Sequence, residues 1–294
     1  NPHNYEHTPG GSSSGSAAAV AENMVPIAFG TQTTGSVIRP AAYCGVIGYK
    51  PTYGDFDKSG ILPNSPSIDT LGLMARSIED ILSMRNILIE EECLLNENLN
   101  INDIRFAFVK TPYWDKIDDD SKVNLENFIS NLIKLNVNVE EIDLNNLILE
   151  SSEIHKKISG FEFKRSISAE RFHHYNELSD ILRNGRLSDG ENMSLSDYHY
   201  LFDHLEKHKH MINNKISSYD CIISPSALGE ALSGLEYTGS PVLNTTWTLL
   251  GLPSITLPMF KSKNNLPIGC QFISKKADDN KLLSISKKIL LEFS

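Results

Sequence analysis

The chain has 294 residues, of which 40% are hydrophobic and 22% are charged, as in an ordinary globular protein. Its 27 basic and 37 acidic residues give a formal net charge of −10 without any block of Lys or Arg, which argues against nucleic acid and against anionic membrane surfaces as partners. No apolar run approaches the roughly 20 residues of a membrane-spanning helix, and the 4 separated cysteines, without metal-ligand spacing, are typical of buried thiols in a cytoplasmic protein.

Two loops of small residues lie near the start of the chain. Thr8 to Ser16 reads T-P-G-G-S-S-S-G-S, and Gly30 to Ser36 reads G-T-Q-T-T-G-S. The residues between them predict a helix, Gly15 to Asn23, and a short strand, Val25 to Thr31. Glycine lets a ligand approach the main chain closely. A serine beside freely oriented backbone N–H groups provides a nucleophile and donors for an oxyanion, which acyl transfer requires.

Two other interpretations of the first loop are weaker. A flexible Gly/Ser linker rarely continues directly into an Ala-rich helix and a strand, as this loop does. A phosphate-binding loop would end in Gly-Lys-Ser or Gly-Lys-Thr, which is absent here.

The next part of the chain alternates between strand and helix patterns. Residues 54–73 are rich in turn residues, and a helix with Ser77 as its cap follows them. Residues 104–109 predict a buried strand, a helix begins near Asp120, and residues 137–142 predict the next strand. This strand–helix–strand order favours an α/β fold with a largely covered sheet.

Residues 150–217 have helical patterns and hold most of the histidines. His204 and His208 are four residues apart, a spacing that can bind a metal on a helix. No H-E-x-x-H pattern surrounds them and they flank an apolar stripe, so we interpret them as packed or solvated side chains. The same holds for His173 and His174, and no metal site is expected.

The C-terminal part again predicts strands and helices. A strand from Cys221 to Ser224 leads into residues 226–241, whose small side chains suggest the rim of an active site. The elements expected after it are a helix at 242–251, strands at 254–257 and 268–273, and an amphipathic helix at 278–293.

Both N-terminal loops, together with C-G-V-I-G-Y-K-P after them, resemble the signature of the amidase signature family of serine hydrolases. The resemblance continues through Y-D-C-I-I-S-P, N-T-T-W-T-L-L-G-L-P-S-I-T-L-P and L-P-I-G-C-Q-F-I, and is poor over residues 100–215. It implies one amidase signature domain over residues 1–294, incomplete at its N-terminus. The implied fold is α/β, a mixed twisted sheet with helices on both faces.

The resemblance assigns catalytic roles to two serines. Ser36 corresponds to the nucleophile of the family. Ser12, held by a cis peptide bond after Gly11, corresponds to the serine that relays a proton between the nucleophile and a lysine. The oxyanion hole corresponds to the backbone N–H groups of Thr33, Thr34, Gly35 and Ser36.

The second loop departs from the usual family pattern in two ways. Asp-Thr-Gly-Gly-Ser is replaced by Q-T-T-G-S at residues 32–36, and the arginine usually two residues after the nucleophile is three after it, at Arg39. A branch of the family shares the form Q-T-x-G-S-V-I-R-P, so we interpret both departures as marks of a subgroup.

The family's lysine lies several dozen residues before the cis serine, whereas only 11 residues precede Ser12. We therefore expect the chain to be a fragment of a longer protein, and to be inactive as it stands because it lacks the proton acceptor. Lys50 lies inside the signature, but its G-x-K-P position is structural in the family. Cys44 has no histidine near it in sequence and is expected to pack rather than react.

The resemblance implies an amidase that hydrolyses a small-molecule amide to a carboxylic acid and ammonia or an amine, without a cofactor. A homodimer is one assembly that such a protein could form. Two alternatives stay open: the amidase subunit of a glutamine-dependent amidotransferase complex, and an inactive truncated relic or binding module. The sequence does not identify the amide.

Overall fold

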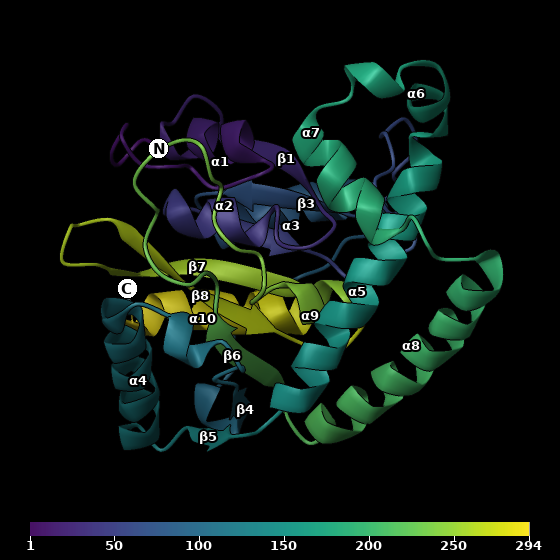
Figure 1. Ribbon diagram of the computed structural model, residues 1–294. Coiled ribbons are helices and arrows are strands. Elements are labelled where there is room, and N and C mark those ends of the chain that lie inside the picture. Colours follow the sequence, from purple (N-terminus) through teal and green to yellow (C-terminus); the bar gives the residue numbers. More distant parts are fainter. Residues whose placement is uncertain (294) are drawn as a thin grey trace.

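Eight strands form one mixed sheet in residues 1–293, the part of the chain that the computed structural model describes (Figure 1). The strands are β1 (Ile27–Gln32), β2 (Ile47–Lys50), β3 (Thr70–Ala75), β4 (Arg105–Phe108), β5 (Asn138–Glu141), β6 (Cys221–Pro225), β7 (Ser254–Lys261) and β8 (Pro267–Ile273). Their order across the sheet is β1-β3-β2-β7-β8-β6-β4-β5. β4 is parallel to both of its neighbours, and the other described pairings are antiparallel.

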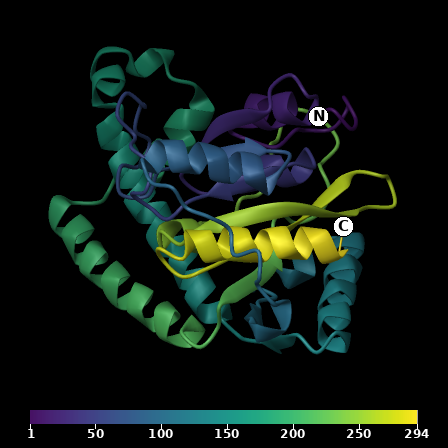
Figure 2. The same cartoon turned by 180° about the vertical axis from the view of Figure 1, so that it is seen from behind.

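Helices cover both faces of this sheet, which confirms the predicted architecture (Figures 1 and 2). The helices are α1 (Ser14–Ala21), α2 (Ile38–Tyr43), α3 (Ile78–Ile89), α4 (Asp119–Lys134), α5 (Asn145–Ser166), α6 (Ser168–His173), α7 (Asp180–Leu182), α8 (Leu195–Ile216), α9 (Thr245–Leu249) and α10 (Asp279–Phe293). On one face α3, α4 and α10 pack against the strands, and on the other α1, α2, α5 and α9 do. No helix within residues 1–293 is long and apolar enough to cross a membrane.

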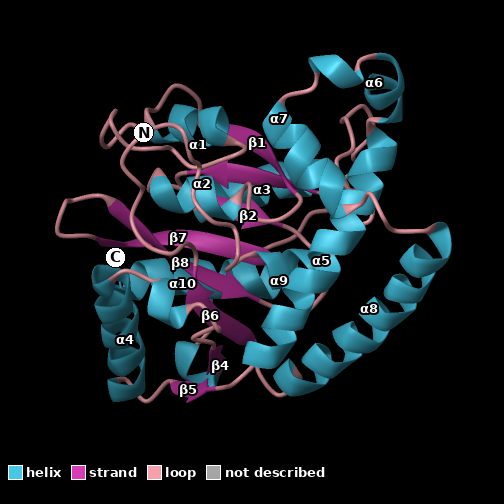
Figure 3. Ribbon diagram, viewed as in Figure 1, coloured by secondary structure: helices cyan, strands magenta, loops and turns pink. Residues whose placement is uncertain are grey.

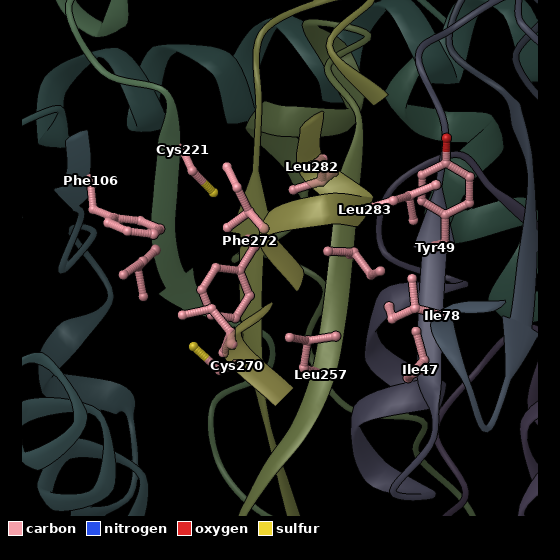
Figure 4. Close-up of a cluster of buried hydrophobic side chains, with 14 of the residues drawn as sticks. Ile47, Tyr49, Ile78, Phe106, Cys221, Leu257, Cys270, Phe272, Leu282 and Leu283 are labelled. Atoms are coloured by element: carbon pink, nitrogen blue, oxygen red, sulfur yellow. The ribbon is translucent and has the colours of Figure 1, made fainter. Parts of the chain in front are cut away.

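The largest hydrophobic core lies on the face covered by α3, α4 and α10 (Figure 4). Phe106, Leu257 and Phe272 point into it from three strands, and Leu282 and Leu283 meet them from α10; all five are fully buried. Full burial of one such side chain contributes about 1.5–3 kcal/mol relative to exposure. This core therefore anchors the fold on one side of the sheet.

Three of the four cysteines are buried, as predicted, but the prediction is wrong for Cys93, which is only partly buried and lies 3.5 Å from Arg85 Nη1. Burial raises the pKa of the Cys44 and Cys221 thiols to about 12, and raises that of Cys270 well above its ordinary value. A thiol must lose its proton to act as a nucleophile, so these three serve as packing residues.

Helix starts follow the capping residues in the sequence. The Ser77 hydroxyl accepts a hydrogen bond of 3.1 Å from the backbone N–H of Asp80 at the start of α3, as predicted. Asp118 caps α4 in the same way, and Ser194 forms a capping box with Asp197 at the start of α8.

The predicted turn-rich segment at residues 54–73 is wrong at its C-terminal end. Residues 70–75 form β3, which is buried at every position because it lies between β1 and β2. The helix α2 and the strand β2, which follow the second loop, are likewise absent from the expectations because six and four residues carry too short a pattern.

The region predicted as helical, 150–217, consists mainly of two 22-residue helices, α5 and α8, joined by the short helices α6 and α7 and the turns around them. His204 and His208 on α8 both lie against Glu150 of α5, at 2.7 and 3.1 Å. These contacts give both histidines a packing role between the two helices.

Candidate active site

The two loops that the sequence singles out meet at one cavity of about 830 Å³. Ser12 and Ser36 both line it, together with Thr33 and Thr34. The opposite wall comes from residues 53–71 and from Arg186 in the turns between α7 and α8. The structure thus brings the predicted nucleophile and the predicted relay to the same space.

The first loop has the backbone that the resemblance predicts: the peptide bond between Gly11 and Ser12 is cis. The Gly11 carbonyl accepts a hydrogen bond of 2.6 Å from Arg39 Nη2. Arg39 is buried, so this charged hydrogen bond is shielded from water. The backbone N–H of Ser13 donates to the Ser36 carbonyl at 3.4 Å and joins the two loops.

Residues 226–241 do not take the rim position that we expected. The described wall of the cavity includes none of them. Instead Thr238 lies behind the first loop, where its hydroxyl is 3.4 Å from Arg39 Nη2. His7 is held in the same area by its Nδ1, 2.7 Å from the Ala231 carbonyl.

The second loop spans residues 33–36, between the end of β1 and the start of α2. The side chain of Gln32 closes it, because Gln32 Oε1 accepts from the backbone N–H groups of Val37 and Ile38 at 2.8 and 3.0 Å. Within residues 1–293, the N–H groups of the four loop residues themselves have no hydrogen-bond acceptor. Unpaired N–H groups beside a cavity form a site for an oxyanion.

Side chains from distant parts of the chain hold this loop from behind. His155 on α5 has its Nε2 2.8 Å from the Thr33 carbonyl. Thr248 on α9 donates its hydroxyl to the Thr34 carbonyl at 2.8 Å. Figure 3 shows α5 and α9 side by side next to the end of β1.

His155 is neutral at physiological pH. Burial lowers the pKa of its imidazole to about 4, and Arg186 contributes in the same direction. Since a carbonyl oxygen only accepts hydrogen bonds, the proton of the neutral ring must be on Nε2, which donates to Thr33.

Asp69 joins the second loop to the opposite wall of the cavity. Its Oδ1 accepts from the Thr33 hydroxyl at 2.6 Å, and its Oδ2 accepts from the backbone N–H groups of Asn64 and Ser65, both at 2.7 Å. The carboxylate therefore fixes the distance between the second loop and the residues that face it.

Two lysines lie in or near the signature loops and the cavity. Lys50 is fully buried away from the cavity, where its Nζ donates to the carbonyls of Pro51 and Leu252 at 2.9 and 2.5 Å. These contacts agree with its predicted structural role. Lys58 does line the cavity, but its Nζ donates to the Asp69 and Pro66 carbonyls and so serves the wall.

The sequence analysis misses several residues of the site. Asp69 lies in the segment S-I-D-T-L-G-L-M-A-R, which follows the second loop in the chain and whose buried polar residue could have drawn attention. His155 and Arg186 lie where the resemblance is poor, and no pattern in the sequence identifies them. Thr248 lies inside a recognised segment, but only the fold shows what it contacts.

Comparison with known proteins agrees with this geometry. The family model described as Amidase matches residues 1–283. A glutamyl-tRNA(Gln) amidotransferase subunit from Staphylococcus aureus is 30% identical over 329 aligned residues, which cover 97% of this chain and 67% of that protein. A crystal structure of an amidase superposes with a TM-score of 0.89 at 25% identity and covers 100% of this chain and 69% of that one. The corresponding glutamyl-tRNA(Gln) amidotransferase subunit from Thermotoga maritima superposes with a TM-score of 0.81 at 27% identity, covering 98% and 67%.

The chain thus spans about two thirds of the length of these relatives. The family match extends over the cavity loops, the sheet and part of α10. On this match, and on the similarity to the Staphylococcus aureus protein, the chain belongs to the amidase family.

Proposed function

We propose that the protein hydrolyses the C–N bond of a small carboxamide, with Ser36 as nucleophile and Ser12 as proton relay. The observation that carries the proposal is the cavity, where Ser12 after its cis bond, Ser36, and a loop of unpaired N–H groups come together. Amide hydrolysis needs each of these parts: a nucleophile, a path for its proton and donors for the oxyanion.

In the proposed reaction Ser36 Oγ attacks the carbonyl carbon of the amide, and its proton leaves through the Ser12 hydroxyl. The carbonyl oxygen becomes an oxyanion held by the N–H groups of residues 33–36. The tetrahedral intermediate collapses when the leaving nitrogen receives a proton back through Ser12, and ammonia or an amine departs. Water then attacks the acyl ester at Ser36 by the same steps and releases the carboxylic acid.

The relay must end at a base, which the resemblance implies is a lysine. No lysine in this sequence matches that position. A general base contributes about 10²–10⁴-fold to such a reaction, so we propose that turnover requires the lysine of the family in addition to the residues seen here.

The test uses the protein expressed with the coding sequence upstream of Asn1, and measures ammonia released from short and aromatic amides. Ser36→Ala is expected to abolish turnover, and Ser12→Ala to leave a small remainder. The double variant should resemble Ser36→Ala, because residues that act as a unit are not additive. Ser130→Ala, on the exposed side of α4, is the matched control and should keep full activity. Labelling by a fluorophosphonate that persists in Ser36→Ala would refute the assignment.

A second candidate function is the amidase subunit of a glutamine-dependent amidotransferase complex. The observation that favours it is the similarity to amidotransferase subunits of Staphylococcus aureus and Thermotoga maritima. Glutamine hydrolysis that appears only after other subunits from the same organism are added would support this function, whereas turnover of simple amides by the protein alone supports the first. The homodimer and the cytoplasmic location stay predictions.

A further inference from the structure

The carbonyl groups of the second loop determine the directions in which its N–H groups point. In a trans peptide bond the C=O and the following N–H point in opposite directions. Whatever fixes the direction of the Thr33 carbonyl therefore fixes the N–H of Thr34, and the Thr34 carbonyl fixes the N–H of Gly35 in the same way. Both of these N–H groups belong to the proposed oxyanion hole.

Each of these two carbonyls has one donor in the described structure. His155 Nε2 lies 2.8 Å from the Thr33 oxygen, and the Thr248 hydroxyl lies 2.8 Å from the Thr34 oxygen. Neither donor lines the cavity, whereas Thr33, Thr34 and Ser36 do. The two carbonyls thus point to donors outside the cavity, and the paired N–H groups point the other way, toward it.

The Thr248 hydroxyl has a single proton and two carbonyls within reach, those of Thr34 at 2.8 Å and Asn244 at 2.9 Å. The Asn244 carbonyl already accepts the backbone N–H of Thr248 at 3.1 Å. The Thr34 carbonyl has no other donor within residues 1–293 and would be left unpaired in a partly buried position. The Thr248 hydroxyl proton is therefore donated to the Thr34 carbonyl.

The hydroxyl is itself held in this orientation. Gln32 Nε2 donates to Thr248 Oγ1 at 2.9 Å, which occupies an acceptor site of the hydroxyl and leaves its own proton for Thr34. Gln32 also closes the loop through Val37 and Ile38. One side chain thus couples the start of α2 to the hydroxyl on α9.

We propose that His155 and Thr248 are positioning residues, which aim the Thr34 and Gly35 N–H groups at the oxyanion by holding the carbonyl groups behind them. The inference rests on the proposed function, since it assigns a purpose to donors of that reaction. Neither residue touches the substrate. Their loss should weaken binding of the transition state much more than binding of the substrate, because the oxyanion exists only after attack.

The experiment compares Thr248→Val with Thr246→Val in the protein that includes the upstream sequence. Both changes remove a buried hydroxyl from α9, but the Thr246 hydroxyl has no hydrogen-bond partner among the described residues. Removal of a whole oxyanion donor costs about 10²–10³-fold in kcat, so misdirection of one donor by Thr248→Val is expected to lower kcat about 10-fold or more. KM should change less than about twofold. Thr246→Val should keep the kcat of the parent, and Thr248→Ser, which retains a hydroxyl, should recover most of it.

His155 is tested in the same way with His155→Phe and His155→Gln. A glutamine side chain can place an N–H near the position of Nε2, so His155→Gln should retain more kcat than His155→Phe. A purely structural role would instead change both variants in proportion to their loss of thermal stability. Equal kcat in Thr248→Val and the parent, or a loss carried by KM, would overturn the proposal.

A crystal structure of Thr248→Val provides a test that does not depend on turnover. We expect the peptide plane between Thr34 and Gly35 to rotate and its N–H to leave the cavity side. An unchanged plane would overturn the inference even in an active amidase. A rotated plane in a protein that hydrolyses no amide would instead count against the proposed function alone.

Discussion

Substitution of Gly35 offers a sharp test of how closely the second loop, the proposed oxyanion hole, is packed. A methyl group at this position would collide with Asn244 Oδ1, and would lie 3.1 Å from both Asn244 Cγ and Pro241 Cβ. Asn244 cannot swing aside easily, because its amide nitrogen donates to the Ser226 carbonyl and to Gln271 Oε1 at 3.1 and 3.0 Å. Non-bonded heavy atoms make favourable van der Waals contact at about 3.5–4.0 Å, so the loop must move by about 1 Å.

A displacement of this size moves the N–H groups that we propose bind the oxyanion. A misplacement of about 1 Å at a catalytic group can cost about 10²-fold in rate. We therefore expect Gly35→Ala to lower kcat/KM for amide hydrolysis about 10²-fold, measured as ammonia release by the protein with its upstream sequence. The free energy of unfolding should fall by about 1–3 kcal/mol, as overpacking usually does.

Gly15→Ala is the matched control. A methyl group at Gly15, on α1, meets no atom of the described residues within 4 Å, so activity should be unchanged. Combining Gly35→Ala with Asn244→Ala removes the nearer of the two side chains that the methyl meets, and should restore part of the activity relative to Gly35→Ala alone. Near-parental activity of Gly35→Ala would show that the loop is not confined as described.

The remaining predictions concern buried basic residues. Arg39→Gln removes the charged donor of the Gly11 carbonyl and should lower kcat about 10-fold or more, since such a bond contributes about 1.5–3 kcal/mol; unchanged kinetics would refute this. Burial lowers the pKa of Lys50 to about 7. Between about pH 7 and the ordinary lysine pKa, Lys50 is therefore protonated in the unfolded chain but neutral in the folded protein. The free energy of unfolding, relative to that of Lys50→Met, should rise with pH across this range. Burial lowers the pKa of His155 to about 4. Its contribution to the free energy of unfolding should therefore be lost as pH falls from about 6.5 to 4. The melting temperature of His155→Gln should fall less than that of the parent over this interval.

The sequence predicts the parts of the site that lie close together in the chain. Ser12 and Ser36 occur in two short loops whose small residues are distinctive, and a resemblance to a known signature assigns them roles. The fold class follows from the strand–helix–strand order at residues 104–142, which the structure confirms as β4, α4 and β5. Both features can be predicted because the residues that carry them are close together in the sequence.

The contacts that complete the site are not local. His155 is 122 positions from Thr33, and Thr248 is 214 positions from Thr34. No periodicity or motif marks either residue as a neighbour of the loop, since both patterns describe ordinary helices. The strand β3 is missed for a related reason: its residues follow a long turn-rich segment, and only its place between β1 and β2 makes all of them buried.

The same kind of backbone contact stabilises both loops of the proposed site. Loops built from Gly, Ser and Thr have few side-chain atoms to pack, so they must be fixed through their backbone. The Gly11 carbonyl is held by Arg39, the Thr33 carbonyl by His155 and the Thr34 carbonyl by Thr248. Each donor comes from a helix outside the loop that it holds. The loops are therefore fixed in place by the helices that cover this face of the sheet. Changes to these donors should therefore reduce catalysis more than they reduce stability, which separates them from changes to the core around Phe272.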